Sequence, residues 1–94
     1  MKRAGIALVL LAGACTATPT PDRDNLAAAL QRYSGMPVAP LALVHIGCQA
    51  ISGEANVFAC RWRQLEGRYW HGWQSRLSHA GESWQIVGEP SRRP

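Results

Sequence analysis

The chain has 94 residues, of which 47% are hydrophobic and 17% are charged, so it is long enough for one small folded domain and too short for two. Ten basic residues against six acidic ones give a formal net charge of +4. Two of the basic residues, Lys2 and Arg3, lie at the extreme N-terminus, and the excess that remains is too small to indicate nucleic-acid binding. We therefore expect no nucleic acid among the partners.

Residues 1–14 have the composition of an export signal. Lys2 and Arg3 precede an uncharged and mostly apolar stretch, residues 4–14. A permanent membrane-spanning helix needs about 20 apolar residues, so this stretch is too short to cross a bilayer. We expect residues 1–14 to act as a signal peptide.

Three small residues, 12–14, stand directly before Cys15. This pattern resembles the lipobox of bacterial lipoproteins, in which the chain is cut before the cysteine and the thiol is joined to diacylglycerol. The resemblance implies that Cys15 is lipidated, and Thr16 in place of an aspartate implies sorting to the outer membrane. The alternative is an ordinary cleavage site between small residues, which would release a soluble protein with an unmodified Cys15.

The cysteine count bears on the same choice. The chain has three cysteines, and an odd cysteine in an exported protein requires an explanation. Lipidation of Cys15 would leave Cys48 and Cys60 as a pair in an oxidising compartment, where we expect a disulfide. The alternative for this pair is two buried free thiols.

A tether and a helix are expected next along the chain. Residues 15–21 alternate proline with threonine and have no apolar periodicity, which is typical of an extended linker. The following segment has helix start and stop signals, with Thr20 or Asp22 as the N-cap and Gly35 followed by Pro37 at the end. The apolar stripe expected to be buried consists of Leu26, Ala29, Leu30 and Tyr33.

From Leu41 onward the apolar period changes to two, which predicts strands. Four segments show this alternation: 41–50, 57–65, 69–77 and 84–88. The side chains expected to face the helix are Val44, Ile46, Cys48, Phe58, Cys60, Trp62, Tyr69, His71, Trp73, Leu77, Trp84 and Ile86. We predict one α+β domain over residues 22–94, with an N-terminal helix packed on a four-stranded antiparallel meander.

Short turns set the predicted strand register. Placing two-residue turns at Glu66-Gly67 and Ala80-Gly81 pairs Trp62 with His71, Cys60 with Trp73, and Leu77 with Trp84. On the first two strands, facing Cys48 with Cys60 also faces Ile46 with Trp62. The layout, with paired cysteines on the first two strands and a tryptophan before the last Ile-Val, resembles small exported proteobacterial proteins of cystatin-like or nuclear-transport-factor-2-like shape. The resemblance concerns the fold and brings no catalytic residues with it.

The sequence offers little catalytic chemistry. Three histidines, His45, His71 and His79, lack metal-ligand spacing to a second ligand, and no serine stands in a glycine-flanked elbow. No two carboxylates fall on adjacent inward positions. We expect neither an enzyme nor a bound cofactor or metal.

The face of the sheet turned away from the helix is the candidate binding surface, made up of His45, Arg61, Arg63, Trp70 and Arg76. In the predicted register Arg63 lies over the Trp70 ring. Gly47 and Gly72 flank Arg61, and because they have no side chains we expect a shallow depression there that could accommodate a partner. The alternative is a solvated face, where arginine and tryptophan merely stabilise strand pairs.

Three functions are compatible with these features. The first is a non-enzymatic binding or accessory lipoprotein in the periplasm, held on the membrane by its lipid anchor and binding an envelope protein or an anionic glycan. The second is an inhibitor or immunity-type lipoprotein that blocks an enzyme with the exposed loop 52–56. The third is a small-ligand binder that uses the concave side of the sheet, which a tryptophan-lined pocket would favour and a filled core would disfavour.

Overall fold

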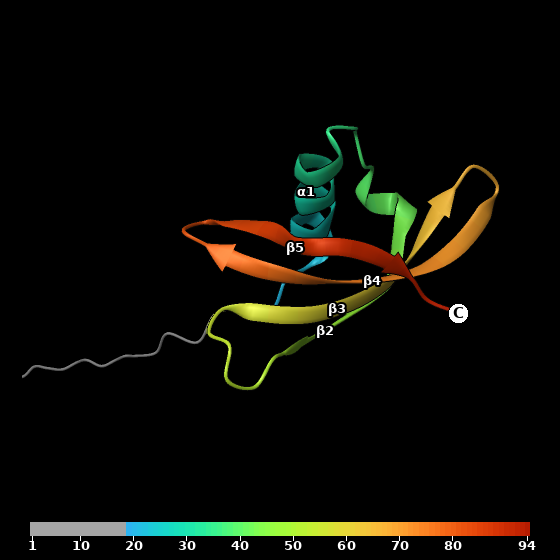
Figure 1. Ribbon diagram of the computed structural model, residues 1–94. Coiled ribbons are helices and arrows are strands. Elements are labelled where there is room, and N and C mark those ends of the chain that lie inside the picture. Colours follow the sequence, from blue (N-terminus) through green and yellow to red (C-terminus); the bar gives the residue numbers. More distant parts are fainter. Residues whose placement is uncertain (1–18) are drawn as a thin grey trace, which may run out of the picture.

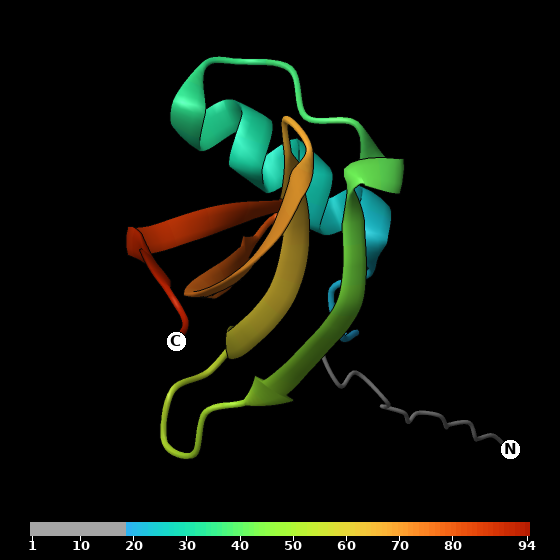
Figure 2. The same cartoon turned by 90° about the vertical axis from the view of Figure 1, so that its right-hand side faces the viewer.

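The computed structural model describes residues 19–94, in which one helix precedes one antiparallel sheet. The elements are helix α1 (Arg23–Ser34), the short 3-10 helix η2 (Pro40–Ala42), and strands β2 (Leu43–Ala50), β3 (Val57–Glu66), β4 (Tyr69–Ala80) and β5 (Ser83–Arg92). The sheet order is β2-β3-β4-β5, and α1 crosses one face of it (Figures 1 and 2). The predicted α+β meander is confirmed. The predicted signal peptide and Cys15 lie outside the described residues.

The start and end of α1 follow from its capping residues. The Asp22 carboxylate accepts a hydrogen bond from the Asn25 backbone N–H at 2.8 Å, and the Asn25 side-chain oxygen accepts one from the Asp22 backbone N–H at 3.0 Å. This reciprocal pair satisfies two N–H groups that have no partner within the helix. At the other end Gly35 adopts a φ of 75° and donates its N–H to the Gln31 carbonyl oxygen.

The buried stripe of α1 is close to the predicted one. Leu26, Ala29 and Leu30 are buried as expected, and Ala27 is buried beside them. The expectation for Tyr33 is wrong, because this residue lies in the last turn of α1, which is exposed, and the side chain itself is 51% exposed.

The core lies between α1 and the sheet. The buried sheet residues are Leu43, Phe58, Cys60, Trp62, Leu77 and Trp84. Phe58 meets Trp84 edge to face, with ring centroids 5.5 Å apart, and Arg32 of α1 donates a hydrogen bond to the Trp84 carbonyl oxygen. Each fully buried leucine stabilises the fold by about 1.5–3 kcal/mol relative to an exposed one. The predicted inward faces of β3 and β5 are confirmed.

The inward face of β2 differs from the prediction because the strand contains a β-bulge. Val44 pairs with Arg63 and Gly47 pairs with Arg61, so His45 and Ile46 together lie opposite one residue of β3. The backbone of His45 accommodates the bulge by adopting a left-handed conformation, with a φ of 53°. Before the bulge the alternation is therefore reversed, and Leu43 is fully buried where Val44 was expected.

Both predicted hairpin registers are wrong by two residues. The turns fall at Gly67-Arg68 and Gly81-Glu82, so Trp62 pairs with Trp73, and Leu77 pairs with Ile86. Gly67 and Gly81 each have a φ of 65°, and each occupies the first central position of its turn, the glycine position of a type II′ hairpin. A shift of two residues keeps each side chain on its predicted face but changes its cross-strand neighbours.

Candidate functional site

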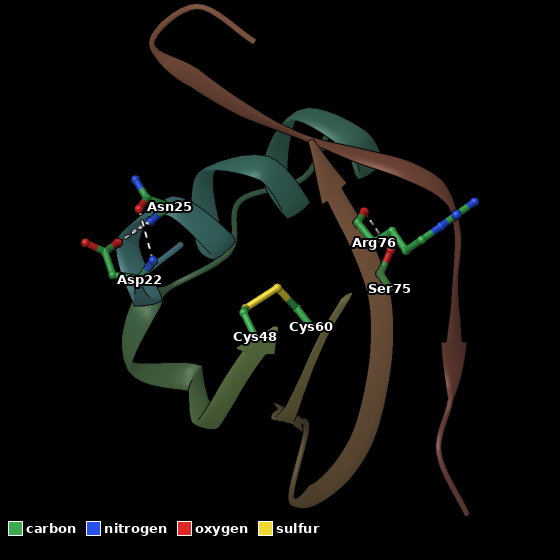
Figure 3. The surroundings of a disulfide bond; sticks show 6 residues. All are labelled: Asp22, Asn25, Cys48, Cys60, Ser75 and Arg76. Carbon is green, nitrogen blue, oxygen red and sulfur yellow. Dashed lines mark hydrogen bonds between the residues drawn. A yellow bond between two sulfur atoms is a disulfide. The ribbon is translucent and has the colours of Figure 1, made fainter. Parts of the chain in front are cut away.

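A disulfide joins Cys48 of β2 to Cys60 of β3, as the sequence predicts. Figure 3 shows it beneath the first turn of α1, near Asp22 and Asn25. Cys60 is 3% exposed, so the bond is part of the core on the helix side of the sheet. It fixes the edge strand β2 to β3 just before the chain enters the loop 51–56.

The predicted surface residues Arg61, Arg63, Trp70 and Arg76 are all exposed. They alternate along β3 and β4 with the inward residues Trp62 and Leu77, which places them on the face opposite α1. Figure 3 shows Arg76 pointing away from the disulfide and from α1. We call this face the arginine face. His45 is also exposed but lies in the bulge of β2, near one end of the sheet.

A groove of about 470 Å³ runs across the arginine face. Its lining includes Gln49, Ala59, Arg61, Gln74, Arg76, Val87, Glu89 and Ser91. The structure therefore brings together two of the predicted residues, Arg61 and Arg76. Arg63, Trp70 and His45 do not line this groove. Sequence reasoning missed the neutral polar lining, because it depends on the true register and on the course of β5.

Arginine side chains cover Gly47 and Gly72, the two glycines at which a shallow depression was expected. A Cβ built on Gly47 would stand 3.6 Å from Cζ of Arg61, so this guanidinium lies against the backbone of the edge strand. A Cβ on Gly72 would stand 3.3 Å from Cβ of Arg93, whose backbone N–H donates to the Gly72 carbonyl oxygen. Gly72 pairs with Arg63 and not with Arg61, contrary to the prediction.

The expected stacking of Arg63 over the Trp70 ring is also wrong. Trp70 pairs with Leu65, and Arg63 donates a hydrogen bond from Nη2 to the Trp70 backbone oxygen at 3.3 Å. Within residues 19–94, the cation-π contact is between Arg92 and the Trp73 ring, 5.0 Å from the centroid. The two-residue register shift accounts for the difference.

Sequence reasoning missed the role of Glu66, which it assigned to a turn. Glu66 is the last residue of β3, and its Oε2 accepts a hydrogen bond from Nε1 of Trp73 at 2.7 Å. Its Oε1 lies 3.4 Å from Nη2 of Arg92 and 3.9 Å from Nε2 of His71. Through these contacts Glu66 links the ends of β3, β4 and β5. His71 pairs with Gln64, not with Trp62 as expected.

The helix side of the sheet has a smaller cleft of about 270 Å³ beside the end of α1. Leu30, Val38, Trp62, Trp73 and Pro90 supply its apolar lining. Its volume falls just below the range of about 300–1,000 Å³ that is usual for small-molecule sites. The indole N–H groups already donate to Gln64 and Glu66, and Trp62 and Trp84 fill the core. These features favour recognition at the surface over binding inside the fold.

The loop between β2 and β3 is exposed but held in place. Its residues 52–56 are all exposed. The Ile51 N–H donates to the Val57 carbonyl oxygen, and the His79 N–H donates to the Asn56 carbonyl oxygen at 2.8 Å. Glu54 forms an ion pair with Arg76 at 3.7 Å, so the loop contacts the edge of the groove.

Residues 19–94 contain no group of three or more His, Cys, Asp or Glu side chains that could hold a metal ion. In the same residues, no helix is long and apolar enough to cross a membrane. No family model matches the chain, and no curated protein or solved structure shows significant similarity to it.

Proposed function

We propose that the chain is a small lipoprotein, anchored to the periplasmic face of the outer membrane, that acts as a non-enzymatic binding or accessory module. The observation that carries this proposal is the Cys48–Cys60 disulfide. It uses two of the three cysteines and leaves Cys15, which directly follows the lipobox-like residues 12–14. Two or three acyl chains on Cys15 would hold the domain on the membrane far more firmly than a single chain.

The arginine face supports the binding part of the proposal. Arg61 and Arg76 are presented from paired strands, β3 and β4, and line a groove rich in side-chain hydrogen-bonding groups. Side chains fixed on a rigid sheet are better suited to recognition than side chains on a mobile loop. An envelope protein or an anionic glycan would be the partner.

Lipid labelling tests the anchor. Cells expressing the full chain are grown with a clickable fatty acid, and the membranes are then separated. We expect label on the wild type and its recovery with the outer membrane, but no label on Cys15→Ala. A variant with Cys48→Ser and Cys60→Ser is the matched control, since it loses the disulfide but keeps the label. An unlabelled, soluble wild type would contradict the anchor.

An inhibitor or immunity-type lipoprotein is the second candidate. It is favoured by the loop 52–56, which is exposed and is held in one shape by contacts to β4. A preformed loop loses little conformational entropy when it enters another protein's cleft.

A photoreactive amino acid placed at Ala55 or at Gln74 distinguishes the two candidate functions in intact cells. Protein crosslinks from Ala55 alone would favour the inhibitor, and crosslinks from Gln74 would favour the binding module.

A further inference from the structure

We infer that the groove of the arginine face binds an acidic saccharide, that is, a sugar unit with a carboxylate or phosphate substituent. The inference rests on the proposed function as a binding module and names its ligand class. It is argued from three kinds of side chain that the groove combines: arginines for the acidic substituent, polar groups for hydroxyls, and an apolar floor for the ring.

Arg61 is available to bind an anion. Within residues 19–94 its side chain makes no ion pair or hydrogen bond, and its guanidinium is held against Gly47 at the groove edge. A guanidinium presents paired N–H donors that match the two oxygens of a carboxylate or phosphate. Arg76 lies on the next strand, with its side chain 51% exposed, and its partner Glu54 is itself half exposed.

The remaining polar lining suits sugar hydroxyls better than a simple anion. Gln49, Gln74 and Ser91 supply both donors and acceptors, and Gln74 donates to Ser91 Oγ at 3.4 Å. Glu89 lines the same groove and is exposed, and its carboxylate has no ion-pair or hydrogen-bond partner among residues 19–94. A free carboxylate repels a bare anion, but it accepts hydrogen bonds from hydroxyl groups. The mixture of charges therefore favours a ligand that carries an acid and several hydroxyls.

The floor of the groove is apolar and small. Ala59, Arg76 and Val87 lie in one cross-strand row, and both Ala59 and Val87 are exposed. Arg76 lies between them on β4, so the C–H face of a sugar ring can pack against either Ala59 or Val87 together with the aliphatic part of the Arg76 side chain. The groove volume of about 470 Å³ lies within the usual range for ligand sites, about 300–1,000 Å³. A lipid headgroup layer would instead favour a flat cationic face, without an unpaired carboxylate such as that of Glu89 in its lining.

An oligosaccharide array tests the inference. The full chain, purified in nonionic detergent, is applied to uronate, phosphate and sulfate oligosaccharides printed beside their neutral counterparts. We expect retention of acidic members only.

Arg61→Gln should weaken that retention about tenfold or more, because it removes a charged hydrogen-bonding group. Arg76→Gln should also weaken it. Arg23→Gln, which removes an exposed arginine of α1, is the matched control and should bind as the wild type does. Melting curves of all variants exclude misfolding.

Three results would overturn the inference. The first is retention of no acidic member, and the second is equal retention of the neutral ones. The third is Arg61-dependent binding to phosphatidylglycerol vesicles with no saccharide bound, which would assign the groove to a lipid headgroup. The anchor is measured separately by the fatty-acid label. Label without saccharide binding contradicts only the inference, and saccharide binding without label contradicts only the anchor.

Discussion

Arg61 of β3 lies across Gly47 of the neighbouring edge strand β2, and the two residues are partners in the strand register. A side chain larger than that of alanine at residue 47 would compete with the guanidinium for the same space. Glycine within a strand costs roughly 0.5–1 kcal/mol of stability relative to alanine. The edge strand is thus less stable at the position where the Arg61 guanidinium lies against its backbone, as expected where backbone and side chains must approach closely.

Changing Gly47 separates stability from recognition. In Gly47→Ala the new Cβ stands at an ordinary contact distance from Arg61, so we expect saccharide binding to persist and stability to rise by up to about 1 kcal/mol. Gly47→Val adds two methyl groups at the guanidinium and should weaken binding without lowering the melting temperature. Thermal unfolding measures the stability of the two variants, and the oligosaccharide array measures their saccharide binding. Wild-type binding by Gly47→Val would show that the position of Arg61 is unimportant.

The disulfide should contribute a large share of the stability. Cys48 and Cys60 are 12 residues apart, and removing a native disulfide from a small exported domain typically costs about 2–5 kcal/mol. We expect the double variant Cys48→Ala and Cys60→Ala to unfold at markedly lower urea concentration. Mass spectrometry after alkylation without reductant should find neither residue modified. Alkylation at both positions in the native protein would refute the bond.

Glu66 should stabilise the end of the sheet where β3, β4 and β5 meet. Glu66→Ala removes the acceptor of the Trp73 indole and the partner of Arg92, and leaving a part-buried donor unpaired costs about 1–3 kcal/mol. Glu66→Gln retains an acceptor oxygen, so its loss should be smaller. Glu82→Ala removes an exposed carboxylate in the turn between β4 and β5 and serves as the control in urea unfolding. Equal stability of the two alanine variants would count against this role.

Local signals predicted the features of the chain that depend on neighbouring residues. The Asp22 cap and the Gly35 stop define α1, and alternation identifies the four strands and most of their inward residues. The exceptions are the start of β2, before the bulge, and Tyr69, which was expected to face the helix and is exposed. The pairing of Cys48 with Cys60 followed from the cysteine count together with this alternation, which places both residues on one face. These features are set within a few residues or by the period of two, so the sequence alone specifies them.

Cross-strand neighbours were not predictable in the same way. The prediction places glycine second in each turn, whereas Gly67 and Gly81 come first. This difference changes the pairs of β3 with β4, and of β4 with the first part of β5, by two residues and preserves the faces. The groove lining also depends on an irregularity between Gln74 and Arg76, where β5 departs from regular pairing. Neither a bulge nor the choice between two turn positions leaves a distinct apolar pattern, so the groove and the Glu66 contacts emerge only from the structure.

The ion pair between Glu54 and Arg76 offers a test of whether the groove or the loop carries the function. Both side chains are about half exposed, so the pair should contribute less than about 1 kcal/mol to stability. Glu54→Gln removes the carboxylate that competes for Arg76. If the groove binds an acidic saccharide, affinity should rise by up to about fivefold, the factor that corresponds to losing a competing pair of this strength. Glu82→Gln removes the same charge at the turn between β4 and β5 and should leave the affinity unchanged.

If the loop 52–56 is the recognition element, Glu54→Gln should instead reduce crosslinking from Ala55, because the contact that holds the loop against β4 is lost. Titration with an acidic oligosaccharide and crosslinking from Ala55 in the same variant therefore give opposite results for the two functions, and an unchanged affinity would remove Arg76 from the binding site.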